Sequence, residues 1–480
     1  MQIKPRRIKK VVIINPRRIG AYSQFSFKDP MPSEGVIIVA TIIKEMGYDS
    51  VVIDESTTPL YSTSSLLQTI AEADIVGVGG MTCTEDRGYY LLREAKKLNP
   101  NVVCLAGGFG ASSNPTKALK QGTDIVVVGE GVETIRELMQ IFSDGGDLDK
   151  VAGITYQQDD AIIKNAQRPL IKNLDNVPFA DWRLVIDYQK IQSRTFTLSA
   201  GCPFRCKFCS AWQFSGGSYR HRSVENAVEY TKWASLGHRP VKWTGKKTLF
   251  IGDDNIAGNK NWTKQYLEEL NKLDLSDISI SAEMRAEYCR DEELMSLLAP
   301  NIGWIFFGYE DITESGLLSI NKKQTPDDIV FSVETCHQYG INIAGMFILG
   351  LDPHTKESGI NIAKFALKHN IDVLILFIRC PFPGTEDTKD LSEAGRLISG
   401  IPTSYRDCQY VVFEPLNMTA QELQMSHLKA IRTFYNVPQA MRDRLNRRIG
   451  NEQLIYRLAG SYYAGKLKNI AGGFASKYLK

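Results

Sequence analysis

Short runs of valine and isoleucine, separated by helical patterns, place the strongest constraint on how the first third of this chain can fold. Five runs occur before residue 130, at residues 10–15, 51–54, 74–79, 101–106 and 124–128. Continuous β-branched runs of this length suit strands that are buried on both faces of a parallel sheet. Stretches with helical periodicity would cover the two faces, at residues 35–46, 85–97 and 132–142. The pattern predicts a doubly wound, Rossmann-like α/β domain over residues 1–155.

Glycines gather where several of these strands should end. They are Gly79 and Gly80, Gly107 and Gly108, and Gly129 and Gly131, with Glu130 between the last two. The carboxyl ends of parallel strands form the edge where ligands bind in this kind of fold. Glycine has no side chain that would hold a flat or bulky ligand away from the backbone. The alternative is that these glycines only end strands and begin turns, but their concentration at one edge favours a ligand site.

The rest of the chain has a different strand spacing. Residues 156–194 are polar and contain prolines, which predicts a linker. Strand patterns then resume at residues 197–199, 248–251, 278–281, 304–308, 343–349 and 373–377. Six strands with helices between them predict a partial (β/α)6 barrel of the TIM type over residues 195–400. Residues 401–480 have no strand pattern after about residue 417, and we expect a small helical domain rich in Lys and Arg.

The nine cysteines are unevenly distributed. Three of them fall within eight residues, at Cys202, Cys206 and Cys209, and the other six are scattered. A disulfide framework would spread its cysteines through a small secreted chain, whereas crowding indicates a metal or cluster site. The scattered cysteines are interpreted as core thiols, namely Cys83, Cys104, Cys289 and Cys336. For Cys380 a buried thiol is also the first interpretation, with a substrate contact or a ligand of an extra cluster as alternatives. Cys408 is the one cysteine after it, which argues against a complete second cluster there.

The three crowded cysteines have the spacing C-x3-C-x2-C, directly after the first strand predicted for the second domain. Three thiolates can bind three irons of a 4Fe–4S cluster and leave the fourth iron without a protein ligand. A substrate amine and carboxylate can chelate such an iron. Zinc is the rival, but structural zinc takes four ligands, commonly from C-x2-C pairs, and no fourth Cys or His follows at such spacing. The spacing therefore predicts a 4Fe–4S cluster.

With the aromatic Phe208 before its last cysteine, this segment resembles the signature of the radical SAM superfamily. Residues 129–134 resemble the GEGE-T turn that ends the cobalamin-binding domain of one class of that superfamily, and residues 176–182 resemble its linker. Residues 212–222 resemble a segment of relatives that act on lipids and tetrapyrroles. To about residue 400 the chain is thus similar to class B radical SAM methyltransferases and the related tetrapyrrole- and lipid-acting enzymes.

The resemblance implies three cofactors: a 4Fe–4S cluster bound by Cys202, Cys206 and Cys209, S-adenosylmethionine (SAM), and cobalamin. It implies reductive cleavage of SAM to a 5′-deoxyadenosyl radical and cobalamin-dependent methylation of an unactivated carbon. Residues 15–20 stand where many cobalamin domains have D-x-H-x-x-G, and they contain no histidine. We therefore expect cobalamin bound base-off and without a histidine ligand.

The ends of the barrel strands supply the candidate contacts with SAM. The resemblance places the methionyl amine near Asp253 and Asp254 and the adenine near Gly345 and Leu349. Arg285 is expected to pair with the SAM carboxylate, since alternation puts it on one strand face with Glu283. The predicted cofactor contacts of the barrel are Phe208, Asp253, Asp254, Glu283, Arg285, Glu310, Gly345 and Leu349. A helix cap is the alternative role for an aspartate here, and a surface ion pair for Arg285.

Composition limits the remaining classes. A formal charge of +3 argues against a dedicated nucleic-acid binder. No apolar run approaches membrane-spanning length, and the four apolar residues after the basic residues 4–10 are too few for a signal peptide, so a cytoplasmic location is expected. Expected partners are a small-molecule, lipid, tetrapyrrole or peptide substrate and an electron donor such as ferredoxin or flavodoxin. Two alternative functions stay open: a radical ring-forming or coupling enzyme on a tetrapyrrole or lipid, and a non-catalytic cluster-bearing binding or sensing protein.

Overall fold

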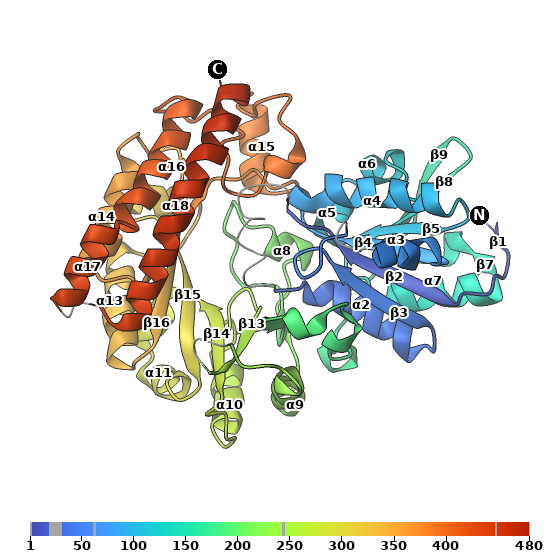
Figure 1. Cartoon of the computed structure of the whole chain (residues 1–480), viewed down its shortest axis with the longest axis horizontal. Helices are drawn as coiled ribbons and strands as arrows, with labels where there is room; N and C mark the ends of the chain where they lie inside the picture. The colour runs from blue at the N-terminus through green and yellow to red at the C-terminus, as the bar shows by residue number, and fades with distance from the viewer. Residues whose placement is uncertain (1, 19–30, 61–63, 242–244, 447–448, 480) are drawn as a thin grey trace. The chain divides into compact units, whose positions relative to one another are not determined.

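The computed structural model describes residues 2–18, 31–60, 64–241, 245–446 and 449–479 (Figure 1). The chain divides into two compact units. One comprises residues 1–199 and 220–249, and the other comprises residues 200–219 and 250–480. The two large sheets have seven and six strands in the described ranges, and the α/β fold class predicted from the sequence is confirmed.

The seven-stranded sheet contains all five strands predicted for the first domain. They are β2 (Lys10–Asn15), β3 (Asp49–Asp54), β4 (Ile75–Gly79), β5 (Val103–Gly107) and β6 (Ile125–Val127). They pair in parallel in the order β3-β2-β4-β5-β6. Strand β3 lies on one side of β2 and β4 lies on the other. The connections that leave the ends of β2 and β4 therefore run in opposite directions. In doubly wound sheets this switch point opens a crevice for a ligand.

An antiparallel hairpin extends this sheet where the sequence predicted the start of a polar linker. Strands β8 (Ile154–Gln158) and β9 (Ala161–Lys164) continue the sheet beyond β6. Tyr156 is buried, whereas Gln157 and Gln158 are exposed. Gln157 and Gln158 are polar because they lie at the solvent-exposed end of an edge hairpin, where the strand no longer contacts the core.

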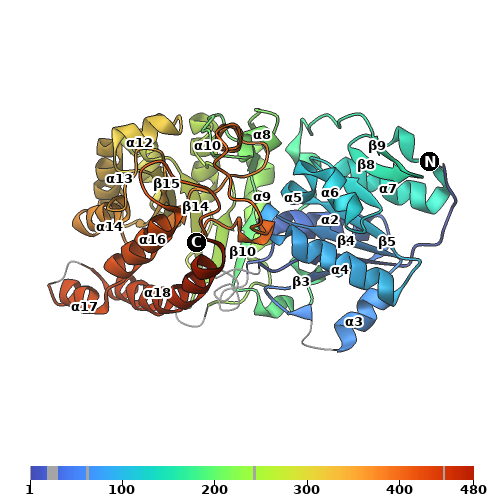
Figure 2. The ribbon, with the colours of Figure 1, turned by 90° about the horizontal axis from the view of Figure 1, so that it is seen from above.

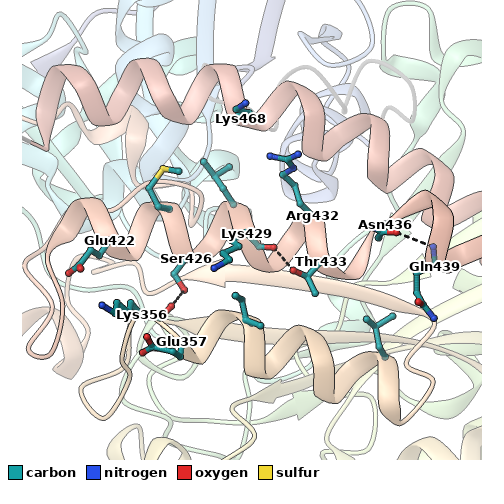
Figure 3. A pocket seen from close by; sticks show the side chains of 14 residues that line it. Lys356, Glu357, Glu422, Ser426, Lys429, Arg432, Thr433, Asn436, Gln439 and Lys468 are labelled. Carbon is teal, nitrogen blue, oxygen red and sulfur yellow. Dashed lines mark hydrogen bonds between the residues drawn. The ribbon is translucent and has the colours of Figure 1, made fainter.

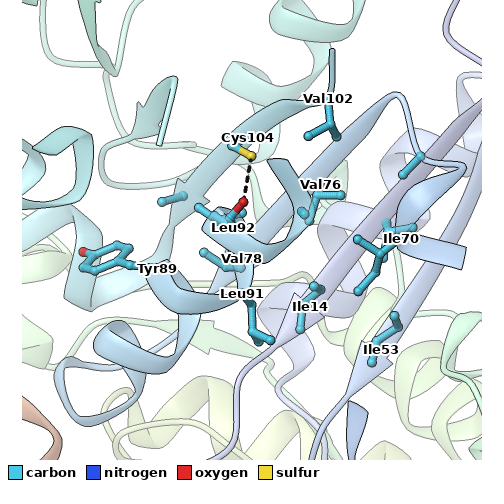
Figure 4. Packing of buried hydrophobic residues seen from close by; sticks show 14 of the residues in the cluster. Ile14, Ile53, Ile70, Val76, Val78, Tyr89, Leu91, Leu92, Val102 and Cys104 are labelled. Atoms are coloured by element: carbon cyan, nitrogen blue, oxygen red, sulfur yellow. Dashed lines mark hydrogen bonds between the residues drawn. The ribbon is translucent and has the colours of Figure 1, made fainter. Parts of the chain in front are cut away.

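Helices cover both faces of the seven-stranded sheet (Figure 1). Helix α2 (Glu34–Glu45) packs with α7 (Val132–Asp144) on one face, and α3 (Ser64–Ala71) packs with α4 (Glu85–Leu98) on the other. Figure 4 shows the core under α3 and α4, in which Val76, Val78 and Cys104 meet Ile70 and Leu92. The Cys104 thiol donates to the Leu92 carbonyl at 3.6 Å, and burial raises its pKa to about 12. The prediction that Cys104 is a core residue is confirmed.

The six-stranded sheet has its strands in chain order. They are β10 (Ser193–Phe196), β13 (Lys247–Ile251), β14 (Ile278–Met284), β15 (Ile302–Glu310), β16 (Asn342–Leu349) and β17 (Val373–Ile378). Strands β14 to β17 pair in parallel, and within the described ranges β17 does not pair with β10. This is the predicted partial barrel.

The first barrel strand begins four residues before its predicted position. Residues Ser199–Ala200 form a separate strand, β11, which pairs with β12 (Arg220–His221). Between β10 and β11 the Thr197 amide donates to the Glu34 carboxylate at 3.0 Å instead of to a neighbouring strand. The pattern in residues 197–199 correctly predicted β structure. The barrel strand, however, is formed by residues 193–196, and residue 199 belongs to β11.

Three helices follow the barrel, as predicted for the C-terminal region. They are α16 (Ala420–Phe434), α17 (Val437–Leu445) and α18 (Asn451–Tyr478). A capping box between Thr419 and Glu422 begins α16. In Figure 2 α16 and α18 lie side by side, and a buried ion pair of 2.8 Å between Arg457 and Asp443 connects α18 to α17. No helix in the described part of the chain is both long enough and apolar enough to span a membrane.

Candidate functional site

The loop that carries the three crowded cysteines is fixed to other parts of the second unit. The Lys207 amide donates to the Ile320 carbonyl at 3.0 Å, and the Asp387 amide donates to the Lys207 carbonyl at 3.2 Å. The Trp212 indole N–H donates to the Cys206 carbonyl at 3.2 Å. Phe208 packs against a small apolar cluster of Ile320, Ile348 and Leu351. Residues following β15 and β17 therefore hold the backbone of this loop in place.

The three thiols lie close enough to influence one another electrostatically. Burial raises the pKa of all three thiols, and that of Cys209 reaches about 12, with further increases from Asp254 and from the other two cysteines. No three His, Cys, Asp or Glu side chains in the described ranges converge as ligands of a single metal ion do. An iron–sulfur cluster does not require its thiolates to converge on one point, because each thiolate binds a different iron. A donor set of three mutually close thiols on a preformed loop therefore fits an iron–sulfur cluster.

Arg285 lies beside this loop. Its Nη1 is 3.9 Å from Cys206 Sγ, and its guanidinium carbon is 3.9 Å from the centre of the Phe204 ring. Nε donates to the Glu287 carboxylate at 2.5 Å, and Nη2 donates to the Lys323 carbonyl at 3.0 Å. The side chain is buried, although the residue directly follows the last residue of β14. The structure therefore places the Arg285 guanidinium against the loop of the three cysteines, with Nη1 towards the Cys206 thiol.

Acidic side chains line the same edge of the barrel. Burial is the largest effect on Glu283, and together with the carboxylates of Asp254 and Glu310 it raises the pKa of Glu283 to about 8. Asp253 adds to this effect, and Lys322 opposes it. These carboxylates follow or lie at the ends of three different strands, β13, β14 and β15. The structure places them close enough to interact electrostatically. Such an edge attracts a cation, because an added positive charge lowers the cost of ionising the carboxylates.

Glu310 has a partner that the sequence analysis missed. Lys322 donates to its carboxylate at 3.1 Å, and both side chains are buried. The backbone of Glu310 is in the left-handed region, with φ of 63°, at the end of β15. A non-glycine residue in this conformation is uncommon, and such residues cluster where a site demands a particular side-chain direction. Lys322 lies in a connection with no motif, so no sequence pattern could have identified it.

Buried polar atoms without partners also collect here. Both side-chain polar atoms of Asn255 are buried and make no hydrogen bond of normal geometry, and the same holds for Glu287 Oε2 and Gln324 Oε1. The Tyr288 hydroxyl is near enough to Asn255 to affect the tyrosine pKa, yet no regular hydrogen bond joins them. Buried polar atoms normally have partners. Unfilled hydrogen-bonding capacity around Arg285 fits a polar ligand with amine and carboxylate groups, as SAM has.

At Gly345 and Leu349, the predicted adenine contacts, the Cα–Cβ direction points away from the inside of the barrel. A Cβ at Gly345 would lie 3.1 Å from atoms of Tyr309, Phe347 and Ile371, so this glycine makes room for the aromatic rings. Leu349 is fully buried, and its side chain lies next to Gly359 of α14 (Ser358–Lys368). These two residues have backbone atoms alone to offer to a ligand in the barrel.

The glycine-rich edge of the first unit serves partly to pack its own loops. Gly108 has φ of 82°, and a Cβ there would lie 2.8 Å from the backbone of Gly80. A Cβ at Gly79 would lie 2.9 Å from the Val36 side chain. At Gly129, by contrast, φ is 80° and a Cβ would meet nothing within 4 Å. Gly107 and Gly131 would make ordinary contacts. The open position is therefore at the end of β6, and the glycines after β4 and β5 allow two loops to touch.

Glu130, predicted as a cofactor contact, is held by protein groups. Arg220 donates to both carboxylate oxygens, at 2.6 and 3.2 Å, and the Ile171 amide donates at 2.8 Å. Such a bidentate pair leaves little capacity for a ligand. In the predicted histidine-free loop, residues 19 and 20 lie outside the described residues. All six histidines of the chain follow residue 220, so residues 1–155 contain none, and His221 and His238 are the histidines of the first unit.

The remaining cysteines are core residues or form thiol pairs. Cys83, Cys289, Cys336 and Cys380 are buried, as predicted. The Cys336 thiol lies close enough to Cys289 to raise its pKa, and the nearby Cys408 thiol adds to the effect of burial on the pKa of Cys380. No sequence pattern indicates either pairing, because the partners are far apart in the chain.

A groove of about 820 Å³ lies outside this region, between α14, α16 and α18 (Figure 3). Ile360, Leu367 and Leu428 are among its apolar lining residues, and Lys429 and Arg432 are among the charged ones. None of the predicted site residues lines it.

Comparison with known proteins agrees with the two-part architecture. A model of the radical SAM superfamily matches residues 196–366, and a model of the B12 binding domain matches residues 25–139. An uncharacterized methyltransferase from Pyrococcus horikoshii is 28% identical over 421 residues, which are 85% of this chain and 89% of that protein. The anaerobic magnesium-protoporphyrin IX monomethyl ester cyclase of Rubrivivax gelatinosus is 25% identical over 378 residues, 75% of this chain and 66% of the cyclase.

Among solved structures, the radical S-adenosylmethionine methyltransferase TsrM from Kitasatospora setae, with cobalamin and a [4Fe-4S] cluster bound, matches with a TM-score of 0.68. The match covers 89% of this chain and 85% of that chain at 16% sequence identity. At this identity the likeness establishes the fold.

Proposed function

Because this chain belongs to the radical SAM superfamily and carries a B12 binding domain, we propose that it is a cobalamin-dependent radical C-methyltransferase. The observation that carries the proposal is the position of Arg285, between the acidic edge of the barrel and the cluster loop, with Nη1 3.9 Å from Cys206 Sγ. A SAM-cleaving enzyme needs a carboxylate-binding cation, an ammonium-binding acidic edge and three thiolates close together. Arg285, the carboxylates around Glu283 and the three cysteines are the groups of the barrel that would meet these needs.

Each side chain has a proposed role. Cys202, Cys206 and Cys209 ligate three irons, and their burial means that cluster assembly must release their protons. Arg285 holds the SAM carboxylate, and the acidic edge containing Glu283 holds the methionyl ammonium. The cofactors, when bound, supply the electron, the radical and the methyl group, and the chain supplies position and exclusion of water.

Cobalamin would bind to the first unit at the carboxyl ends of its strands. Open space at Gly129 and the switch point between β2 and β4 support this location. The absence of histidine before residue 220 supports a base-off cofactor without a histidine ligand. A soluble iron–sulfur or flavin protein in the cytoplasm is the proposed electron donor, and the substrate class extends to lipids, tetrapyrroles and peptides.

Ring formation on a tetrapyrrole without methyl transfer is the second candidate. It is favoured by the 25% identity to a magnesium-protoporphyrin cyclase. Both candidates use the same cluster and the same SAM site, so they differ in the chemistry that comes after SAM cleavage.

The products formed from SAM distinguish the two candidates. The protein would be reconstituted anaerobically with iron, sulfide and hydroxocobalamin and reduced with titanium(III) citrate in the presence of SAM. A methyltransferase should form both 5′-deoxyadenosine and S-adenosylhomocysteine, because one SAM would be cleaved and another would give up its methyl group to the reduced cobalamin. 5′-Deoxyadenosine alone would favour the ring-forming candidate. If neither product forms, both candidates fail, and the Cys209→Ala variant sets the background.

A further inference from the structure

Two helices of the C-terminal region carry large apolar side chains on their exposed faces. On α17 they are Val437, Met441 and Leu445, with Leu445 80% exposed. On α18 they are Ile455, Leu458 and Tyr462, of which Ile455 is 49% and Tyr462 55% exposed. The spacings of three and four residues put each set on one side of its helix. Exposed apolar residues scattered singly are ordinary, but two ordered stripes are not.

Each stripe lies opposite the buried side of its helix. The buried residues of α17 are Ala440 and Asp443. Those of α18 include Ala464, Leu467 and Ala471. By the helical period these positions point roughly away from the stripes. The stripes therefore face away from the protein, and they do not contribute to its core.

The segment of the sequence that carries the stripes is strongly basic. Residues 437–480 contain nine Lys and Arg against two Asp and Glu, a net +7. The whole chain carries +3, so the other 436 residues carry −4. Asp443 and the buried Arg457 pair at 2.8 Å and neutralise each other, so the remaining eight cations and one acid give the same net +7. The net positive charge of this protein is thus concentrated in the segment of the sequence that carries the two stripes.

We infer that α17 and α18 form a docking surface for an anionic lipid membrane. An apolar stripe flanked by Lys and Arg is the arrangement by which helices lie in the membrane interface, with apolar side chains inserted and cations at the head groups. Lys466 illustrates the geometry, since its Nζ lies 4.8 Å from the centre of the exposed Tyr462 ring. Lysine and tyrosine both combine an apolar body with a polar end, which suits them to this boundary.

A second copy of the chain is the less favoured occupant. Two identical stripes would bring two +7 segments together, and their repulsion opposes self-association. An anionic surface instead gains from every cation. The inference depends on this surface alone, and it does not require the function proposed for the barrel.

Vesicle sedimentation tests the inference. The full chain with its cofactors reconstituted would be mixed with vesicles of phosphatidylcholine alone and with vesicles containing 30% phosphatidylglycerol. We expect binding to the anionic vesicles, weakening with added salt, and little binding to the neutral ones. Leu445→Glu and Leu458→Glu should each reduce binding roughly tenfold or more, because an inserted leucine is replaced by a charge that the lipid repels.

Leu318→Glu is the matched control, because Leu318 is 76% exposed on α12 (Glu314–Ser319), outside the C-terminal helices. It should bind vesicles like the wild type, and thermal melting checks that all three variants are folded. Absence of binding to anionic vesicles, or equal losses in all three variants, would overturn the inference. A dimer in analytical ultracentrifugation that Leu458→Glu converts to a monomer would also overturn it, because the stripe would then be a self-association surface.

Discussion

Arg285 and Cys206 are 79 positions apart in the sequence, and the arginine Nη1 lies 3.9 Å from the cysteine Sγ. Phe204 lies under the guanidinium plane and Glu287 binds Nε, so the arginine has a fixed direction. This relationship makes Arg285 the most informative residue of the barrel to change.

Arg285→Lys should weaken SAM binding roughly 10- to 100-fold, since lysine keeps the charge but loses the planar fork, worth about 1.5–3 kcal/mol. The cluster should remain, because no iron ligand has changed. Equilibrium SAM binding and iron content measure the two effects. Arg290→Lys is a matched control, because Arg290 also combines an ion pair, with Asp328, and a ring contact, with Phe331, but at the surface. SAM affinity of Arg285→Lys within twofold of the wild type would reduce Arg285 to the partner of Glu287.

Replacing Cys202, Cys206 and Cys209 together by alanine should abolish the brown 4Fe–4S absorption and all formation of 5′-deoxyadenosine. Cys380→Ala and Cys408→Ala should retain both, because these two thiols lie near each other and outside the C-x3-C-x2-C segment. Absorption spectra and iron analysis after anaerobic reconstitution provide the measurement. A triple variant that still held about four irons would refute the assignment of the ligands, and loss of iron in Cys380→Ala would revive the extra cluster.

Hydroxocobalamin should bind to the reconstituted protein, and the Co(II) form should show no nitrogen splitting from a lower ligand in paramagnetic resonance. The reason is that no histidine precedes residue 220. Splitting by nitrogen would contradict the predicted coordination. Failure to bind the cofactor at all would remove methyl transfer from the proposed function.

Gly108→Ala and Gly129→Ala should behave differently, although both glycines have a left-handed backbone. Each substitution costs on the order of 1–3 kcal/mol for the conformation itself. At Gly108 the new Cβ would also lie 2.8 Å from the Gly80 backbone, whereas at Gly129 it would enter open space. Thermal melting should show the larger loss of stability for Gly108→Ala, and cobalamin titration should show weaker binding for Gly129→Ala. If the two variants had equal stability and equal affinity for cobalamin, the proposal that this edge binds the cofactor would be wrong.

Acid should destabilise the second unit through His427. Burial lowers the pKa of this histidine to about 4, and its Nε2 lies 2.8 Å from the Leu376 carbonyl. Since the folded pKa is below the unfolded value of about 6.5, its contribution is complete above pH 6.5 and is lost as the pH falls towards 4. At pH 5 the loss reaches about 2 kcal/mol at most, at 1.4 kcal/mol per unit. Thermal melting of His427→Gln should therefore depend less on pH between 6.5 and 5.

His337→Gln should change the pH dependence of thermal stability in the opposite direction in the same experiment. Asp372 lies 3.1 Å from His337 Nε2 and raises the pKa of that histidine. Its stabilisation is present below pH 6.5 and is lost as the pH rises through the folded pKa. If both variants changed the pH dependence in the same direction, the assignment of these two histidines would be wrong.

The sequence by itself determined the two sheets and the cluster loop. Buried parallel strands require continuous apolar runs, and these runs are visible at all five parallel strands of the first sheet, as in residues 10–15, but not at its edge hairpin β8–β9. The three cysteines proposed as cluster ligands lie within eight residues on one loop, so their spacing alone brings them together. The helices after residue 417 were equally plain from the loss of strand patterns.

Tertiary structure alone decided which distant residues meet. Lys322 with Glu310, Cys380 with Cys408 and Arg285 with Cys206 are pairs that depend on strand register and on how the connections close. Gly345 shows the same limit, because whether a strand glycine faces a ligand or an aromatic ring depends on the neighbouring strands. Periodicity records which side of an element is buried, but it contains no information about the groups that lie against that side.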